Sequence, residues 1–169
     1  LCCLCMRAGT VTDVITGDKL LQFYPGPSST GEKIADFKEF NGMKFESTAE
    51  YNAKCVVRSD YGNAILLKSN YKGRGFVATK SGGKVKNIKI TWGEGNSYWS
   101  SLFIYGNNDP YQSPLDIWEG SDDYMGTRLG FIDYTSEGDE CTFNITEDYN
   151  YIGFLAYWSD GEENVVLDK

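Results

Sequence analysis

The sequence of 169 residues contains no histidine. Histidine is the commonest general base and the commonest metal ligand in enzymes, because its side chain titrates near neutral pH. A catalytic zinc ion would have to rest on cysteine and carboxylate alone, outside the usual ligand sets of such sites. The absence of histidine therefore argues against metal-dependent and histidine-dependent catalysis.

Positive charge is also scarce. Sixteen Lys and Arg residues face 24 Asp and Glu residues, which gives a net charge of −8. Nucleic acid is not expected as a partner, because phosphate binding requires a basic patch. Four lysines do cluster, at Lys80, Lys84, Lys86 and Lys89. We interpret them as the solvated face of a strand, where lysines also block pairing of its edge with other strands. An anion site is the alternative.

Cysteine is rare after the first five residues. Cys2, Cys3 and Cys5 crowd the start of the chain but lack the C-x-x-C spacing of a zinc site, so none is predicted. Cys55 and Cys141 stand alone in strand-like segments. They form a disulfide if the protein is exported, or they are separate buried thiols, and the sequence leaves both alternatives open.

The first ten residues are interpreted as an N-terminal tail. The apolar start LCCLCM matches either the end of a signal peptide or the end of a fragment. It is too short to span a membrane, so no membrane insertion is expected.

The composition that is present favours β-structure. The chain has 12 Tyr, nine Phe and 19 Gly residues, with 41% hydrophobic residues overall, which suits short strands joined by glycine turns. The length matches one domain with a sizeable core. We expect residues 11–169 to form a single all-β domain, an antiparallel β-sandwich of jelly-roll type with one or two short helical turns in its loops.

The stretch from residue 75 to residue 92 carries the strongest strand signal. Residues 76–79 form an apolar, β-prone run, and Ile88, Ile90 and Trp92 alternate with polar residues. The glycines of the Ser-Gly-Gly connection accept positive φ, as tight turns require. The pattern predicts a β-hairpin with one buried face.

Further elements follow from the same signals. A helical turn is expected at residues 16–21 with Thr16 as its N-cap, and another at residues 113–118. Strands are expected at residues 11–15, 54–57, 64–68, 102–105, 128–134, 141–145, 151–157 and 165–167. The segment 102–105 is apolar on both faces and should be a central strand.

The predicted core draws on these strands. Its members, in or near the interior, are Ile88, Ile90, Trp92, Ile104, Phe131, Phe143, Ile145, Ile152 and Phe154. Residues 31–53 show no clear pattern. Their large apolar side chains are expected to anchor them to the core whatever their conformation: Phe37, Phe40, Met43 and Phe45.

Several runs together carry a family resemblance. After an early VTDVITGDKLL come, in order, SGGKVKNIKITW, LFIYGNNDPYQSPLDIW, GTRLGFI, YNYIGFLAYW and VVLDK. Over residues 11–169 this order resembles a β-sandwich module of secreted and surface proteins from Bacteroidetes-type gut bacteria. The resemblance implies one part of a larger extracellular protein, without a catalytic motif. It also implies that the last strand is cut short, because in similar sequences that strand continues after the Asp-Lys pair.

Aromatic side chains near loops are the best candidates for ligand binding. Sugar rings present C–H faces that stack on indole and phenol rings, while polar groups take the hydroxyls. The candidate residues are Trp99, Tyr111, Trp118, Tyr98, Glu94 and Asn96. The alternative is that the rings of Trp92 and Trp118 only fill the core or anchor loops. The chain departs from the family in carrying Trp99, Trp118 and Trp158.

Carboxylates suggest two weaker alternatives. A glycosidase needs a matched pair, and no spacing singles out two among Glu94, Asp116, Glu119, Asp122 and Asp123. A structural calcium ion takes carboxylate and carbonyl oxygens from loops. Such oxygens are offered by Asn107, Asp109, Asp160 and Glu162, without the spacing of a known calcium loop. No other cofactor is expected.

The expected function is therefore that of a non-catalytic module, extracellular or on the cell surface, with a glycan ligand and other domains of the same protein as partners. A structural or adhesin-type spacer is the first alternative. A glycoside hydrolase is the second and weaker one, for lack of histidine and of a matched carboxylate pair.

Overall fold

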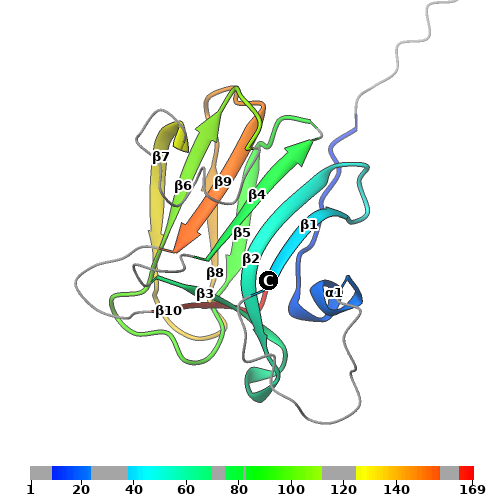
Figure 1. The fold of residues 1–169 in the computed structure, drawn as a ribbon. Helices are drawn as coiled ribbons and strands as arrows, with labels where there is room; N and C mark the ends of the chain where they lie inside the picture. Colours follow the sequence, from blue (N-terminus) through cyan, green and yellow to red (C-terminus); the bar gives the residue numbers. More distant parts are fainter. Residues whose placement is uncertain (1–8, 24–37, 70–74, 82, 112–124, 157–163) are drawn as a thin grey trace, which may run out of the picture.

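The computed structural model describes residues 9–23, 38–69, 75–81, 83–111, 125–156 and 164–169. These residues form an antiparallel, mostly-β fold with an eight-stranded sheet and a two-stranded sheet. The larger sheet has the order β10-β3-β2-β4-β9-β6-β7, with β1 also paired to β2. It curls strongly into a half-barrel (Figure 1). The smaller sheet is β5-β8.

The element bounds follow the chain. They are α1 (Gly17–Gln22), β1 (Lys38–Lys44), β2 (Glu50–Arg58), a 3-10 turn η1 (Ser59–Tyr61), β3 (Ala64–Lys68), β4 (Phe76–Ser81), β5 (Asn87–Thr91), β6 (Ser101–Asn107), β7 (Thr127–Asp133), β8 (Glu140–Asn144), β9 (Tyr151–Ala156) and β10 (Asn164–Leu167). All predicted strands from residue 54 onward that lie in the described ranges are confirmed. The predicted helical turn at residues 113–118 lies outside them.

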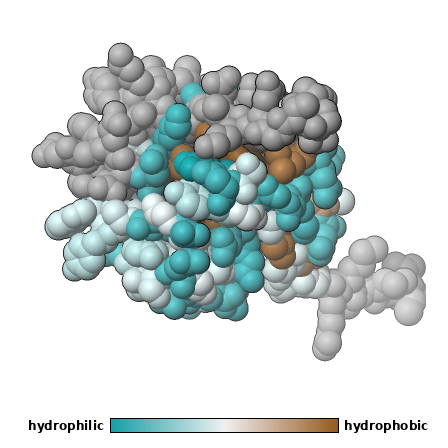
Figure 2. All heavy atoms as spheres, turned by 90° about the horizontal axis from the view of Figure 1, so that it is seen from below, coloured by the Kyte–Doolittle hydropathy of each residue, from teal (hydrophilic) through white to brown (hydrophobic). Residues whose placement is uncertain are grey.

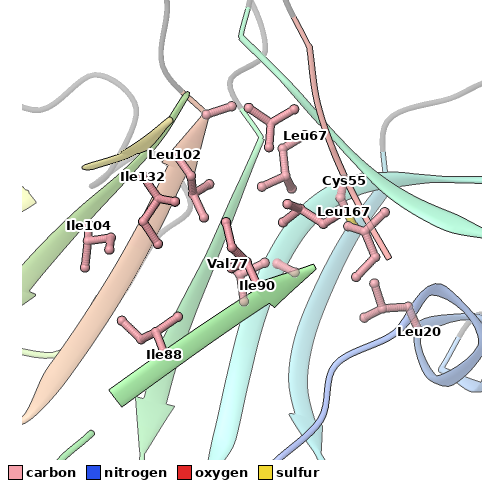
Figure 3. Packing of buried hydrophobic residues seen from close by; sticks show 14 of the residues in the cluster. Leu20, Cys55, Leu67, Val77, Ile88, Ile90, Leu102, Ile104, Ile132 and Leu167 are labelled. Atoms are coloured by element: carbon pink, nitrogen blue, oxygen red, sulfur yellow. The ribbon is translucent and has the colours of Figure 1, made fainter. Parts of the chain in front are cut away.

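The main core fills the space between the two sheets. Figure 3 shows Ile88 and Ile90 of β5 directed toward Val77, Leu102 and Ile104 of the larger sheet. The alternating burial of β5, with Ile88 and Ile90 buried and Asn87 and Lys89 exposed, matches its predicted period of two. Burial of such side chains is the main favourable contribution to folding.

The predicted hairpin of residues 75–92 is wrong, although both of its strands exist. β4 pairs with β2 and β9, whereas β5 pairs with β8. The glycine-rich connection therefore carries the chain from the larger sheet to the smaller one. The local turn signal contained no information on which strand each segment pairs with.

The last strand joins the two sheets. β10 pairs along one edge with β3, from Asn164 opposite Lys68 to Leu167 opposite Ile65. Along the other edge it meets the end of β5, where Trp92 forms a bridge with Leu167 and the Gly93 N–H donates to the Val166 carbonyl at 2.9 Å. β10 thus belongs to the larger sheet and holds the smaller one in place.

The N-terminal region differs from its prediction. Residues 11–15 run as irregular chain, so the strand expected there is wrong. The helical turn after them is confirmed as α1, and the Thr16 hydroxyl accepts a hydrogen bond from the Lys19 N–H at 3.2 Å. In the segment without a clear pattern, β1 contains Phe40 and Met43, which are buried as expected, and Phe45 packs partly buried against the core. Phe37 lies outside the described residues.

One of the nine predicted core residues is misplaced. Phe131 is 55% exposed, whereas the other eight are buried or packed against the core. The reason is a bulge in β7, where Ile104 pairs with Gly130 and Tyr105 pairs with Arg128, so that Leu129 is an extra residue. The extra residue places Leu129 and Phe131 on opposite faces, although regular alternation would put them on the same one.

The isolated cysteines do not pair. Cys55 and Cys141 are free thiols, so the disulfide alternative is wrong. Cys55 is fully buried, and this burial raises its pKa to about 12, which keeps the thiol protonated and unreactive.

Within the described residues, no helix is long and apolar enough to cross a membrane.

Candidate functional site

The most exposed aromatic side chains lie next to each other between β5 and β6. Among the described residues, five large hydrophobic side chains are exposed, and Tyr98 at 81% and Trp99 at 64% are the two most exposed. Their rings are perpendicular, with centroids 5.4 Å apart and an interplanar angle of 86°. Figure 2 views the molecule from below and shows a mostly hydrophilic surface with separate hydrophobic areas. A ring pair of this exposure is unusual on such a surface.

The backbone of residues 97–100, here called the aromatic turn, is fixed by its own serines. The Ser100 N–H donates to the Ser97 carbonyl at 3.0 Å, which closes a four-residue turn with Tyr98 and Trp99 at its centre. The Ser97 hydroxyl accepts from the Trp99 N–H at 3.2 Å, and the Ser100 hydroxyl accepts from the Ser97 N–H at 3.1 Å. Polar side chains thus satisfy the backbone, and the aromatic side chains remain free to face solvent.

Asn96 attaches the loop before this turn to β10. Its side-chain carbonyl accepts from the Val166 N–H at 2.8 Å, and its amide nitrogen donates to the Val166 carbonyl at 2.7 Å. The same amide nitrogen donates to the Gly93 carbonyl at 2.9 Å. Asn96 therefore imitates a neighbouring strand, and its polar groups serve the loop rather than the solvent. The sequence prediction placed Asn96 among ligand-binding residues, whereas the structure gives it a positioning role.

A second contact holds the loop from the side of η1. Gly95 has φ +95°, and a Cβ at this position would lie 3.3 Å from the Tyr61 ring. Gly95 therefore packs against the Tyr61 ring. The Arg58 guanidinium carbon lies 4.6 Å from the centroid of the Tyr61 ring, and the Arg58 Nε donates to the Asp60 carboxylate at 2.7 Å. The aromatic turn is supported by β10 and η1 together.

The remaining predicted ligand residues are distributed differently. Glu94 is exposed at the start of the loop. Tyr111 is 3% exposed, and its hydroxyl donates to the Met125 carbonyl at 3.0 Å. A ring so buried cannot stack on a sugar, so Tyr111 is removed from the candidate site. Trp118 lies outside the described residues. Trp92 is fully buried, as the core alternative predicts.

The charged candidates form no site in the described part of the chain. No three His, Cys, Asp or Glu residues gather there as metal ligands. Asn107 is occupied in a local turn, where its side-chain oxygen Oδ1 accepts from the Asp109 N–H at 3.0 Å. Outside the described residues lie the other calcium and glycosidase candidates Asp160, Glu162, Asp116, Glu119, Asp122 and Asp123.

The lysine cluster is paired with carboxylates. Lys84 and Lys86 contact Asp148 at 2.9 and 2.8 Å, and Lys89 contacts Glu140 at 2.7 Å. Hydrogen bonds from Lys86 and Lys84 lower the pKa of Asp148 to about 2. Lys80 lies 3.9 Å from a carboxylate oxygen of Glu50, so all four lysines are neutralised locally, which favours the interpretation as a solvated strand face over an anion site.

A group of residues that the sequence did not suggest lies on β6 and β7. Leu102 and Ile104 of β6 face the core between the sheets, so Ser101, Phe103 and Tyr105 face away from it. Opposite them on β7 are Asp133, Phe131 and Arg128. We call the group Ser101, Phe103, Arg128, Phe131 and Asp133 the outer strip. Its Phe131 was assigned to the core, and only the bulge at Leu129 reveals its true side.

A polar cluster near the N-terminus was also not expected. The Asp13 carboxylate accepts hydrogen bonds from the Ser47 N–H at 2.7 Å, from the Ser47 hydroxyl and from the Tyr51 hydroxyl at 2.6 Å. Partial burial alone would raise the pKa of Asp13, but these hydrogen bonds outweigh burial and lower it. Burial, followed by the hydrogen bond to the same carboxylate, raises the pKa of Tyr51. With every oxygen of Asp13 occupied, the cluster fastens the N-terminal segment to β2 and offers no free group for chemistry.

A small cleft opens between β7 and the end of β8. Its volume is about 110 Å³, and it is lined by Thr127, Arg128, Leu129, Phe143, Asn144, Ile145, Thr146 and Glu147. Ligand pockets usually have volumes of about 300 Å³ or more, so this cleft is too small to hold a drug-sized ligand. The aromatic turn remains the best candidate site.

Comparison of the chain with protein-family models, with curated proteins and with solved structures finds no match in any of the three.

Proposed function

We propose that this chain is a non-catalytic, extracellular module of a larger secreted or surface protein and that it binds carbohydrate through Tyr98 and Trp99. One observation carries the proposal. The two most exposed rings of the described residues are neighbours, at 5.4 Å and nearly perpendicular, on a turn whose backbone is fixed by hydrogen bonds. The family resemblance of the sequence supports the extracellular location and the finer fold, a jelly-roll-like sandwich.

The ring geometry suits a sugar. Perpendicular rings form a corner in which one sugar ring lies on the face of the first aromatic and meets the second at its side. Glu94, exposed in the same loop, supplies carboxylate oxygens for hydroxyl groups. The fixed turn reduces the ordering cost of binding, because the rings are already held in place.

Two other functions are weaker. A spacer has no use for a fixed pair of exposed rings, which lower solubility unless they bind something. A glycosidase needs two carboxylates at a defined separation across the scissile bond, and of Glu94 and Asp133 beside the turn, Asp133 already accepts a hydrogen bond from the Ser101 hydroxyl.

The test is a titration with soluble β-glucan, xylan, mannan and mucin glycans, followed by tryptophan fluorescence and calorimetry. Binding of at least one glycan is expected, and Trp99→Ala and Tyr98→Ala should each weaken it about tenfold or more. Phe23→Ala is the matched control, since Phe23 is another exposed ring, at the end of α1. Silence across the panel, with both variants folded, would leave the spacer function instead.

A further inference from the structure

The outer strip begins where the aromatic turn ends. Trp99 is two residues before Ser101, the first residue of β6, and the Tyr134 N–H donates to the Ser100 carbonyl at 2.9 Å, which continues the pairing of β6 with β7. From Ser101 to Tyr105, opposite Arg128, the strand advances four residues. At 3.3–3.4 Å per residue, the strip extends over about 13 Å beyond the turn.

Each row of the strip carries a different kind of group. In the first row the Ser101 hydroxyl donates to one oxygen of Asp133 at 2.6 Å, and the second oxygen remains available as an acceptor. In the second row Phe103 and Phe131 lie with centroids 6.0 Å apart and an interplanar angle of 51°. Phe131 is more than half exposed there.

Arg128 closes the strip at its far end. Its guanidinium carbon lies 5.4 Å from the centroid of the Phe103 ring. Among the described residues, no carboxylate or carbonyl accepts from this guanidinium, so its five N–H donors are free for hydroxyl oxygens. Stacking on Phe103 holds the guanidinium plane in a fixed orientation.

The sequence of groups along the strip is that of an extended binding surface. Beyond the two rings of the turn, the strip offers in order the Asp133 carboxylate, the exposed Phe131 ring and the Arg128 guanidinium on the outer face of β6 and β7. Adjacent stacking positions lie about 4.5–7 Å apart, so a strip of about 13 Å holds about two sugar rings beyond the one on the turn. A single terminal sugar would contact only the turn.

We propose that the ligand of the aromatic turn is a linear oligosaccharide of at least three sugars that continues along the outer strip, with Phe131 as a second stacking platform and Arg128 as a hydroxyl ligand. The inference rests on the proposed function and adds the ligand's shape and direction. Because the strip contains a carboxylate and a guanidinium that can both bond to hydroxyls, an uncharged chain fits it.

The experiment uses a polysaccharide that binds in the panel, cut into size-fractionated oligosaccharides of two to six sugars. Calorimetry on the whole chain should show an affinity about tenfold higher for the longer oligosaccharides than for the disaccharide. The reason is that the longer ligands occupy one further stacking position. Phe131→Ala should abolish this gain and leave the affinity for the disaccharide unchanged. Phe131→Trp should restore the gain, and Arg128→Lys should lose part of it, since lysine lacks the planar fork.

The failures can be distinguished. Affinity that does not depend on length, or that Phe131→Ala leaves unchanged at every length, overturns the outer strip and leaves the proposed function standing. Loss of the disaccharide affinity in Phe131→Ala contradicts the separation of the two positions. If no oligosaccharide binds at all while the variants stay folded, both the strip and the proposed function are wrong.

Discussion

The loop between β5 and β6 has a tryptophan near each end, and the two have opposite surroundings. Trp92 is fully buried and makes a perpendicular contact with Tyr134 at 5.5 Å, whereas Trp99 is 64% exposed and makes a similar contact with Tyr98 at 5.4 Å. The ring pairs are nearly identical in geometry. What differs is the backbone, because Trp92 lies between β10 and the residue before β8, while the backbone bonds of Trp99 are met within its own turn. Strand neighbours, and not residue type, decide which ring is enclosed.

The largest effect is expected from Trp92→Ala. Removal of a fully buried indole leaves a cavity, and such substitutions cost about 3–5 kcal/mol of the free energy of unfolding. Urea denaturation followed by far-UV circular dichroism measures the loss. Trp92→Phe should cost clearly less, because among the described residues the indole N–H has no hydrogen-bond partner to lose. Equal losses for both variants would contradict this account.

Asn96 connects the two regions, and Asn96→Ala should have an intermediate effect. The substitution leaves the Val166 N–H without its acceptor, while the Val166 carbonyl keeps its bond from the Gly93 N–H, and the cost is about 1–3 kcal/mol. Hydrogen exchange of the Val166 amide should become faster than that of Leu67 in β3. Asn96→Asp is the sharper comparison, since it keeps the acceptor for Val166 but loses both donated bonds.

Asp13 binds the N-terminal segment to Ser47 and Tyr51, and its contribution to the free energy of unfolding should be smaller and dependent on pH. Because its folded pKa lies below the ordinary value, its contribution is present above about pH 4 and is lost as the pH falls through the lower folded value. Asp13→Asn should therefore cost about 1–2 kcal/mol at pH 7 and much less near pH 2. Thermal melts of both proteins at the two pH values test it. A difference that stays constant with pH would show that the carboxylate charge is not involved.

The smallest effect on stability is expected from Trp99→Ala. Substitution of an exposed side chain such as Trp99 usually changes the free energy of unfolding by less than about 0.5 kcal/mol. The same denaturation experiment as for Trp92 measures it, so the two tryptophans can be compared directly. If Trp99→Ala lowers the free energy of unfolding as much as Trp92→Ala does, Trp99 is a core residue in solution. That result would contradict the candidate site.

The sequence predicted local patterns well and distant pairing poorly. Ile88, Ile90 and Trp92 were placed in the core because alternation along one strand is a local signal. Their partner β8 lies about fifty residues further along the chain, and no local pattern contains that information. A short glycine-rich connection favours pairing of the two strands that it joins, and this local signal predicted the wrong hairpin.

The candidate site was predicted in part. Tyr98 and Trp99 were predicted because aromatic side chains beside a loop can stack on the C–H faces of sugars. The role of Asn96 could not be foreseen, since its partner Val166 is seventy residues away. Phe131 was misplaced because a single extra residue, Leu129, reverses the side on which every following side chain lies. Tyr111 was misplaced because a loop residue beside a strand can be covered by a second cluster of apolar side chains.

The position of β10 has a consequence for how the chain folds. Ile65 pairs with Leu167, so the strand that joins both sheets meets its partner only across about a hundred residues of chain. Contacts of such long range slow folding, because the entropy of closing a large loop is lost before any bond is formed. Until that contact forms, the edge of β3 remains open to strands of other chains. Rapid dilution from denaturant at high protein concentration should therefore favour aggregation over refolding, and slow dilution at low concentration should reverse the outcome.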